Sequence, residues 1–392
     1  MADGSDAVLA RTVSSIDEID RDIWNALADR PGQPFNPFVA HEFLSALEQS
    51  GSVAPETGWG PMHLVLEDHG EVTGVMPLYA KGHSQGEYVF DHHWADAYMR
   101  AGGQYYPKLL CAAPFTPVPG PRLLAKTDDA RQRLAFALRQ IVQQMGVSSA
   151  HVNFTTDKDQ TALTAAGFLP RMGEQFHWFN RGYQSFDDFL EQLSSRKRKA
   201  IRRERRDACA KGVAIRHLTG GEIEERHWDA FWMFYLDTGA RKWGEPYLTR
   251  DFFRLIAETM PEHLLMIVAE REDAGVSQPI AGALNFIGGD TLYGRYWGCT
   301  EDVPFLHFEI CYHQAIDYAI AHGLARVEAG AQGQHKIARG YEPVPTHSAH
   351  WIADSGFRGA IDNYLEAERA QTGMEIEALR DYMPFKKTDH KG

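Results

Sequence analysis

The sequence predicts an α/β protein made of two similar units in tandem, followed by a C-terminal helical appendage. Its 392 residues are long for one hydrophobic core and comfortable for two domains of ordinary size. Its 44% hydrophobic residues, with 11% aromatic residues, are typical of a globular protein. One order of elements occurs twice: helices, a strand hairpin, a long helix closed by glycine, and a short strand. The two copies agree best between 145–154 and 322–329. We therefore expect domains at 1–182 and 183–360, with a helical and flexible tail at 361–392.

The first unit is expected to begin with a disordered stretch of about ten residues. A strand and then a helix should follow over 12–27, with Ser14 or Ser15 as the helix N-cap. Asp68-His69-Gly70 is a hairpin turn signal, and Gly51, Gly146 and Gly167 stand where helices should end. The other expected segments are helices at 41–49, 128–145 and 156–166, and strands at 62–67, 71–80, 149–154 and 168–179.

Residues 81–122 read as a long irregular region, rich in aromatic residues and histidine. Long loops of this composition inside a compact domain favour a functional role.

The second unit should repeat the pattern. The expected helices lie at 186–211, 222–236, 249–260 and 307–322, and the expected strands at 213–218, 264–271, 279–287, 291–298 and 325–329. Residues after 360 form a charged helix that we expect to pack on the body as an appendage.

The stretch 195–206 carries eight basic residues and one acid, whereas the whole chain has a net charge of −13. Solubility does not require such a block, because the rest of the chain is already strongly negative. At helical spacing Ile201 and Ala208 form a thin apolar seam that can dock the helix 195–211. The basic side chains then form two neighbouring faces: Arg196, Lys199, Arg203 and Arg206 on one, and Arg198, Arg202 and Arg205 on the next. The pattern fits an anion-binding face or a solvated charged face, and charge alone does not decide between them.

The richest stretch for chemistry is 328–343, which follows a predicted strand and contains several glycines. Gly330 and Gly333 would let the backbone approach a ligand closely. Lys336 and Arg339 are one helical turn apart, so both can reach one developing anion, and His335 adds a titratable group. The alternative is an ordinary loop with surface charges, and we favour function.

Two groups of residues are acid–base candidates. In the first half Asp91 and His92 stand together, with Lys108 downstream, although a buried, hydrogen-bonded histidine would read the same way. In the second half Glu309, with His313 and Asp317, follows helical spacing. A satisfied polar helix face is the alternative there.

Several classes of protein are disfavoured by the sequence. The four cysteines have no paired or metal-ligand spacing, so we expect free thiols in the cytoplasm and no metal site. No apolar run is long enough to cross a bilayer, and the acidic N-terminus does not resemble a secretory signal. An isoelectric point near 5.8 argues against non-specific coating of nucleic acid, and we expect no DNA partner. Nucleophile-elbow, Walker and Rossmann motifs do not occur in the sequence.

With these residues in view, the chain resembles the FemAB-like group of bacterial GNAT-type acyltransferases, also described as peptidoglycan biosynthesis/recognition proteins. The resemblance covers residues 38–351. The matching motifs are Gly86-Glu-Tyr-Val-Phe-Asp91, Tyr105-Tyr-Pro-Lys-Leu109, Pro114-Phe-Thr-Pro-Val118, Ser195-Arg-Lys-Arg198 onward, Gly330-Ala-Gln-Gly-Gln-His-Lys336 and Ala338-Arg-Gly-Tyr341.

The resemblance implies two tandem GNAT-like units and an acyl transfer to an amine, with no permanently bound cofactor. The donor would be acyl-CoA or aminoacyl-tRNA, and the acceptor a small molecule or a peptidoglycan precursor. By resemblance, Lys336 would stabilise the oxyanion, with Arg339 as its substitute. Glu309 or His92 would accept a proton if one must be removed. The residues expected to bind donor or substrate are Arg198, Arg202, Arg203, Lys108, Asp91, Tyr105, Gly330, Gly333 and Tyr341.

One departure from the GNAT pattern concerns the donor. GNAT enzymes bind the coenzyme A pyrophosphate on a loop of the form Arg/Gln-x-x-Gly-x-Gly/Ala, and this sequence lacks it; Arg100-Ala-Gly-Gly has its first half only. A second hypothesis is therefore kept beside the acyltransferase. In it, the chain is a non-catalytic module that binds an anionic nucleotide-linked ligand or RNA.

Overall fold

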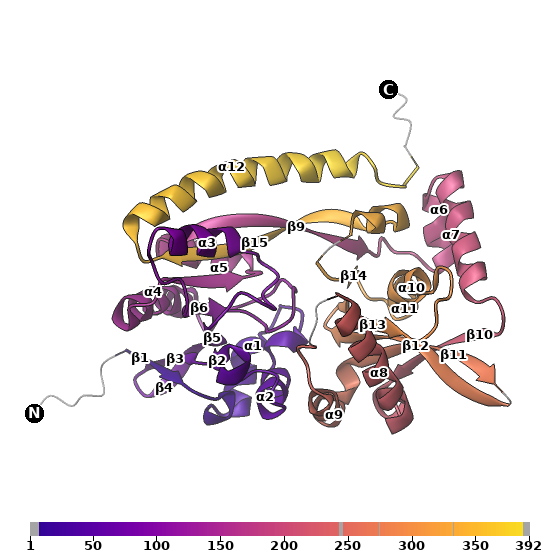
Figure 1. Ribbon diagram of the computed structural model, residues 1–392, viewed down its shortest axis with the longest axis horizontal. Helices are drawn as coiled ribbons and strands as arrows, with labels where there is room; N and C mark the ends of the chain where they lie inside the picture. Colours follow the sequence, from indigo (N-terminus) through magenta and orange to yellow (C-terminus); the bar gives the residue numbers. More distant parts are fainter. Residues whose placement is uncertain (1–7, 243–245, 274, 332, 387–392) are drawn as a thin grey trace, which may run out of the picture. The chain divides into compact units, whose positions relative to one another are not determined.

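The computed structural model describes residues 8–242, 246–273, 275–331 and 333–386 (Figure 1). The chain divides into two compact units. Unit 1 comprises 1–174, 247–252 and 345–374, and unit 2 comprises 175–246, 253–344 and 375–392. The chain first passes from unit 1 to unit 2 after Glu174, whereas the expected boundary was at Gly182. Residues 345–374 belong to unit 1, whereas the expected second domain extended to 360. Of the stretch expected to be disordered, residues 1–7 lie outside the described residues, and a strand already begins at Leu9.

The elements of unit 1 follow the expected order with additions. The strands are β1 (Leu9–Val13), β2 (Trp59–Pro61), β3 (His63–Asp68), β4 (Glu71–Met76), β5 (Leu78–Lys81), β6 (Lys108–Cys111), β7 (Leu124–Ala125), β8 (Ser149–Asn153) and the first part of β9 (Leu169–Phe179). The helices are η1 (Ile16–Glu18), α1 (Arg21–Ala28), η2 (Pro37–Val39), α2 (His41–Gln49), η3 (Pro55–Thr57), α3 (His92–Arg100), α4 (Asp128–Met145) and α5 (Asp157–Ala165). Most of β15 (Glu342–Ile352) and of α12 (Ser355–Arg380) also belongs to this unit.

Unit 2 contains the end of β9 and the start of β15. Its strands are β10 (Val213–Thr219), β11 (Leu264–Asp273), β12 (Val276–Gly288), β13 (Thr291–Cys299) and β14 (Arg326–Glu328). Its helices are α6 (Phe186–Gln192), α7 (Ser195–Ala208), η4 (Gly220–Glu222), α8 (Glu225–Lys242), α9 (Arg250–Thr259), η5 (Pro261–His263), α10 (Leu306–Phe308), the π-helical η6 (Glu309–His313), α11 (Gln314–Ala321) and η7 (Gln334–Arg339).

Both units are built on mixed sheets. Unit 1 has a four-stranded antiparallel sheet, β1-β3-β4-β7, and the strand order β15-β8-β6-β5-β2, in which β6 and β8 are parallel. Unit 2 has the order β10-β11-β12-β13-β14-β9, in which β13 and β14 are parallel. The rest of the unit 2 ladder is antiparallel where its register is defined, so each unit has one parallel pair within a mostly antiparallel sheet.

Local signals set several elements where we expected them. Helix α4 begins after Thr127, whose side chain accepts from the Ala130 amide, and ends at Gly146 with φ +66°. The expected strand 71–80 is interrupted at Pro77, which has no N–H for the ladder. Its first part, β4, pairs with β3 and β7, and its second part, β5, pairs with β2 and β6.

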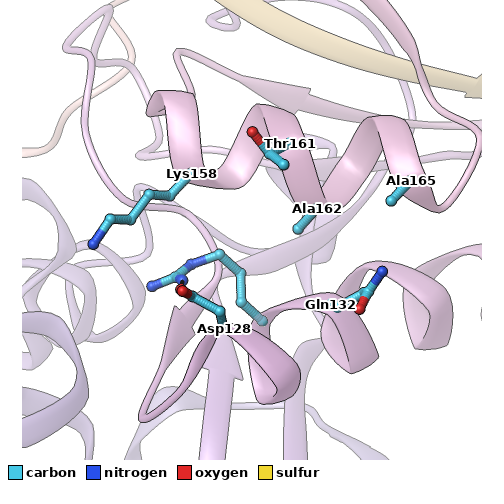
Figure 2. Close-up of a pocket in the computed structure, with 7 residues that line it drawn as sticks. Asp128, Gln132, Lys158, Thr161, Ala162 and Ala165 are labelled. Carbon is cyan, nitrogen blue, oxygen red and sulfur yellow. Dashed lines mark hydrogen bonds and ion pairs between the residues drawn. The ribbon is translucent and has the colours of Figure 1, made fainter.

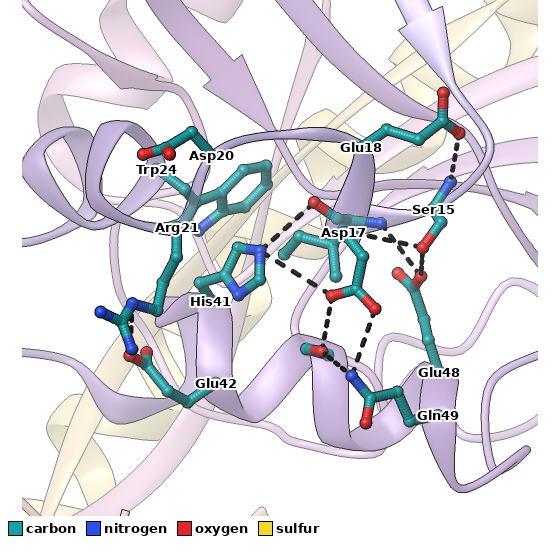
Figure 3. A network of polar contacts seen from close by, with 12 residues as sticks. Ser15, Asp17, Glu18, Asp20, Arg21, Trp24, His41, Glu42, Glu48 and Gln49 are labelled. Atoms are coloured by element: carbon teal, nitrogen blue, oxygen red, sulfur yellow. Dashed lines mark hydrogen bonds and ion pairs between the residues drawn. The ribbon is translucent and has the colours of Figure 1, made fainter. Parts of the chain in front are cut away.

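A polar network fixes the start of unit 1 (Figure 3). Ser15 caps η1, and its hydroxyl donates to Glu48 on α2 at 2.9 Å. The other Glu48 oxygen lies 2.6 Å from Nε2 of the buried His63. Asp20, rather than Ser14 or Ser15, caps the α-helix that follows. The expected serine cap therefore exists but belongs to a 3₁₀ turn.

Two further expectations differ from the structure. The region 81–122 is not wholly irregular, since it contains α3 and β6. The helix expected at 186–211 is broken at Leu193, which is extended and bridges to Phe385. The amide of Ser194 then donates to the Pro384 carbonyl, so a segment distant in sequence ends α6.

Aromatic and aliphatic side chains fill the two cores. In unit 2 helix α8 lies close to β13, and an added Cβ at Gly298 would stand 2.2 Å from the Phe234 carbonyl oxygen. Helix α12, yellow in Figure 1, starts earlier than expected and packs on unit 1 through Ile361 and Leu365. The appendage is therefore an integral part of that unit.

Candidate functional site

Two neighbouring strands of unit 2 separate where the candidate loop begins. β13 and β14 pair in parallel up to Tyr293 and Glu328. Beyond this point β13 continues to Cys299, whereas the chain after Glu328 enters the glycine-rich loop. Arg295 is the extra residue of a β-bulge on β13 immediately after the pairing ends. Bulges bend a strand and redirect its side chains, so the fork between β13 and β14 starts with Glu328 on one arm and Arg295 on the other.

Lys336 lies on the loop that leaves this fork. Its side chain is buried, and its Nζ donates to the carbonyls of Ala329 at 2.6 Å and Gly330 at 3.0 Å. Gly330 and Gly333 have φ of +78° and +119°, which allows the turn that brings η7 back over its own carbonyls. Burial lowers the pKa of Lys336 to about 8. Gly330, which the sequence marks for close backbone approach, thus binds the Lys336 ammonium through its carbonyl, and the role of Lys336 in a reaction stays a prediction.

Arg339 and His335 surround Lys336 on the same turn. The Arg339 guanidinium donates to the His335 carbonyl at 3.0 Å and to Glu204 at 2.9 Å, and it stacks 3.5 Å from the ring centre of Phe308. His335 is exposed, and its Nε2 lies 2.9 Å from the hydroxyl of Tyr312. A neutral His335 is favoured, because burial and the charges of Lys336 and Arg339 lower its pKa.

Tyr341 closes the turn from below. Its side chain is fully buried, with its ring 5.6 Å from that of Tyr312. Its hydroxyl has no hydrogen-bond partner among the described residues. The Tyr341 ring therefore supports the loop from within the core. Its role in ligand binding stays a prediction.

Glu309 belongs to a saturated network that anchors α7. Its buried carboxylate accepts from Arg205 at 3.1 Å, from Gln314 at 2.7 Å and, at the other oxygen, lies 3.0 Å from His313 Nδ1. Burial acts to raise the pKa of Glu309, but the His313 hydrogen bond and the Arg205 charge lower it below its ordinary value. The predicted pairing of Glu309 with His313 is present, and it lies in the π-helical segment η6. Such segments occur often at functional sites.

The basic helix α7 divides into two parts. Ile201 and Ala208 are buried as expected and dock the helix. In the second part Arg202 pairs with Asp187 at 2.8 Å, and Arg203 and Arg206 pair with Asp207. In the first part, residues 196–199 make no ion pair within the described chain.

The eight basic residues are therefore not one uniform ligand-facing block. Arg198 keeps an unneutralised charge, whereas the exposed Arg202 and Arg203 each have an acid beside them. Glu204, the only acid of the run, turns toward the site and binds Arg339. The helix is thus attached to the Lys336 turn through Glu204.

Unit 1 gathers a second set of predicted residues. Lys108 is fully buried, and its Nζ donates to Ser84 at 2.8 Å, Glu87 at 2.8 Å and Asp91 at 2.5 Å. The Tyr105 hydroxyl donates to the same Asp91 oxygen at 2.7 Å. Burial works against the Lys108 charge, but the two carboxylates outweigh it and raise the Lys108 pKa. Burial instead raises the pKa of Glu87 to about 7. Lys108, Asp91 and Tyr105 thus form one network.

His92 does not join that network. It is exposed on the first turn of α3 and stacks on Phe90. The histidine beside the network is instead the buried His151, whose Nε2 lies 3.3 Å from the Tyr105 hydroxyl and whose Nδ1 lies 2.7 Å from His350. Burial lowers the pKa of His151 to about 3, so its ring is neutral.

The parallel pair of unit 1 offers no comparable fork. β6 and β8 pair up to Cys111 and Val152. Just beyond the paired part of β8, the buried Arg122 donates from its Nε to the Asn153 carbonyl at 2.9 Å and from its Nη2 to the Val118 carbonyl at 2.5 Å. Among the residues that the structure describes, the strand fork that leads into a turn around a buried lysine is in unit 2.

No group of described residues has the ligands for a metal ion. A pocket of about 240 Å³ lies between α4 and α5, lined by Asp128 and Lys158 among others (Figure 2). It contains none of the predicted site residues, and Arg131 at its wall is already paired with Asp128 and Asp159. We therefore do not assign the reaction to it.

The comparison with protein families decides the relationship of the chain. Residues 15–387 match the FemAB-like family, described as peptidoglycan biosynthesis/recognition. The chain belongs to the FemAB-like family. No curated protein matches its sequence.

Solved structures share the fold of this FemAB-like chain at low sequence identity. FemX is 13% identical, with a TM-score of 0.54 over 88% of this chain and 98% of FemX. The C-terminal domain of a putative lysylphosphatidylglycerol synthetase from Agrobacterium fabrum is 9% identical, with a TM-score of 0.55 over 89% of this chain and 96% of that domain. L-PGS from Bacillus licheniformis is 9% identical, with a TM-score of 0.50 over 91% and 100% of the two chains. The expected α/β fold is confirmed, and the chain shares it with FemX over nearly the whole of FemX.

Sequence reasoning missed several polar residues of this FemAB-like chain. The sequence pattern singles out the stretch 328–343, but it assigns no role to Glu328. It does not identify Arg295, because a β-bulge cannot be recognised from the sequence. His151 could have been found from the sequence, because Ser149, His151 and Asn153 alternate along β8, and such alternation indicates a polar face.

None of the described helices is both long and apolar enough for a membrane span.

Proposed function

We propose that the chain is an N-acyltransferase that moves an acyl or aminoacyl group from an activated donor to an amine in cell-wall precursor metabolism. Membership of the FemAB-like family supports this, as does the fold shared with FemX. The observation that carries the proposal is the Lys336 turn at the β13/β14 fork.

The Lys336 ammonium is suited to oxyanion stabilisation. Two of its three N–H donors are used by the Ala329 and Gly330 carbonyls, which fix the direction of the third. Because the group is buried, its charge acts on a developing oxyanion with little screening by water. With a pKa of about 8 it is still mostly protonated at neutral pH. A pre-placed cation of this kind stabilises the tetrahedral oxygen that forms when an amine attacks an ester or thioester.

The donor carries phosphates in either form, acyl-CoA or aminoacyl-tRNA, and the chain has cations for them. Residues 196–199 at the start of α7 are the unneutralised ones, so Arg198 is a better donor contact than Arg202 or Arg203. The absence of the GNAT pyrophosphate pattern from the sequence favours the aminoacyl ester over the thioester. The buried network of Lys108, Asp91 and Tyr105 is our candidate for acceptor binding in unit 1.

The test is a transfer assay on the full chain. Purified protein is incubated with acetyl-CoA or with charged tRNA, together with a nucleotide-linked peptidoglycan precursor, and acylated acceptor is measured by mass spectrometry. We expect Lys336→Met, which keeps length and burial, to lower kcat by about 10²–10³-fold. Lys158→Met on α5 is the control and should not change it. The proposal fails if no donor is consumed, or if Lys336→Met is as active as the unchanged protein.

One observation favours a second function, a non-catalytic module for RNA or an anionic nucleotide-linked ligand. It is the unneutralised charge of residues 196–199 in a chain of net charge −13. RNA binding predicts a steep dependence of affinity on salt, and neutralising these four residues should reduce the slope by about 0.7 per lost phosphate contact. Neutralising Arg202 and Arg203 should change it less. A shallow slope in the unchanged protein would exclude RNA as the ligand.

A further inference from the structure

Glu328, the last residue of β14, is a buried carboxylate that is only partly satisfied. It is 4% exposed, and its Oε1 lies 3.2 Å from Nε of Arg326 on the same strand. Its Oε2 is buried and accepts no hydrogen bond within the described chain. A buried oxygen without a donor costs stability, so a group left in this state calls for an explanation.

The place of Glu328 in the fold supplies one. The β13/β14 pairing ends at Glu328, and the next two carbonyls, of Ala329 and Gly330, hold the Lys336 ammonium. Glu328 therefore stands directly before the two residues whose carbonyls hold the Lys336 ammonium. An acid–base group and an oxyanion donor must be close neighbours if one reacting carbon is to lie between them.

The groups around Glu328 allow it to be either protonated or ionised near neutral pH. His177 on β9 presents Nδ1 3.9 Å from Glu328 Oε1, and its Nε2 is hydrogen-bonded to Gln175 at 3.1 Å. Burial lowers the pKa of His177 to about 3, so the ring is neutral and Nδ1 faces the carboxyl as an acceptor. Burial raises the pKa of Glu328 to about 7, against the opposing charges of Arg326 and Arg295. The charged and titratable groups that face Glu328 are Arg326, Arg295, Asp290, Tyr293 and His177.

We propose that Glu328 is the proton acceptor for the attacking amine, with its free Oε2 directed to the amine nitrogen. This inference rests on the proposed acyl transfer. The amine lone pair forms the new C–N bond while the carbonyl π electrons move to the oxygen that faces Lys336. Glu328 takes one proton from the nitrogen. The carbonyl then re-forms, the C–O or C–S bond of the donor breaks, and the proton passes from Glu328 to the leaving oxygen or sulfur.

The two bases expected from the sequence fit this role less well. Glu309 already accepts from Arg205 and Gln314 and contacts His313, and its lowered pKa makes it a weak base. We infer that Glu309 positions α7 through Arg205 instead. His92 lies on the surface of unit 1, on a different element from every residue of the Lys336 turn.

The test compares the pH dependence of transfer in the unchanged protein and in Glu328→Gln. In the unchanged protein kcat/KM should rise with pH through about 7 as the carboxylate ionises. In Glu328→Gln the rate should fall by about 10²–10⁴-fold, and this rise should disappear, leaving only the titration of the acceptor amine. The matched control is Glu342→Gln, which removes a carboxylate that pairs with Arg181 at the edge of the same unit. It should keep both the rate and the pH profile.

A second pair of variants separates catalysis from support of the fold. Glu328→Asp keeps the charge beside Arg326 and should keep the rise with pH at a reduced rate. Glu328→Ala should regain activity with added formate, which a purely structural loss would not show. Glu328→Gln with an unchanged pH profile, or Glu328→Ala without formate rescue, would overturn the inference while leaving the acyltransferase proposal intact. Failure of the unchanged protein to consume any donor would instead overturn the proposed function itself.

Discussion

The basic helix provides the sharpest test of the structural reasoning, through Arg205. Its guanidinium binds buried Glu309 at 3.1 Å and Asp317 at 3.0 Å, and it stacks 4.1 Å from the ring centre of Phe186. Replacement by alanine leaves the Glu309 carboxylate buried with one cation fewer. Arg205 is therefore expected to hold the fold of unit 2, in contrast to its neighbours on the same helix.

The size of the effect follows from burial. Removing one partner of a buried ion pair costs about 3–5 kcal/mol. The Arg205 side chain is 23% exposed, so we take the lower end, about 3 kcal/mol, to allow for solvent screening. For a unit of this size each kcal/mol shifts Tm by about 2–4 °C, which gives a fall of roughly 6–12 °C. The control is Arg206→Ala. That side chain is 73% exposed, and its one ion-pair partner among the described residues is the adjacent Asp207, so its loss should be close to neutral.

The assay is differential scanning calorimetry of the full chain at pH 7 and at pH 3. The folded-state pKa of Glu309 is lowered, so its stabilisation is present above the pKa of an unfolded glutamate and is lost as pH falls through the folded value. The difference between Arg205→Ala and the unchanged protein should consequently shrink in acid. If Arg205→Ala melts within a degree of Arg206→Ala, or if the difference is the same at both pH values, the buried-pair reasoning is wrong.

Three further outcomes are expected. Asp91→Asn should destabilise unit 1 at pH 7 by about 3 kcal/mol, because it strands the buried ammonium of Lys108. Burial acts to raise the Asp91 pKa, but Lys108 lowers it, so this loss, measured by urea unfolding, should be largest above the pKa of an unfolded aspartate and should shrink as pH falls below that value. Gly298→Ala should lower the stability of unit 2 by about 1–3 kcal/mol or more in the same assay, since the new methyl group meets the Phe234 backbone oxygen; a neutral result would contradict the close packing. Cys111 is fully buried, and burial raises its pKa, so it should react with a thiol reagent only as unit 1 unfolds. Prompt reaction in the folded protein would contradict this.

Elements with complete local signals were predictable residue by residue. The structure places α2 at His41–Gln49 and α4 at Asp128–Met145, the bounds expected from the sequence. Thr127 and Gly146 supply the cap and the stop of α4 within the sequence neighbourhood of the helix itself. The apolar seam of Ile201 and Ala208 is likewise a matter of spacing along one helix, and both residues are buried.

Elements decided by distant partners were not predictable in this way. The break between α6 and α7 depends on Phe385 and Pro384, which are far from Leu193 in sequence. Helix α3 was hidden in a stretch whose aromatic residues and histidines suggested a loop. One face of it packs on Ile361 and Leu365 of α12, and the sequence around α3 does not contain that surface.

The amino-acid sequence by itself determined the duplicated α/β plan, the family, the basic helix and the glycine-rich loop that carries Lys336, because each depends on composition, spacing or a local motif. Only the tertiary structure decided which charges stay available. It paired Arg202 with Asp187, committed Glu309 to Arg205, and left an oxygen of Glu328 without a donor among the described residues. The reason is physical: the state of an ionisable group depends on burial and on partners within a few ångströms, and folding brings those partners from distant parts of the chain.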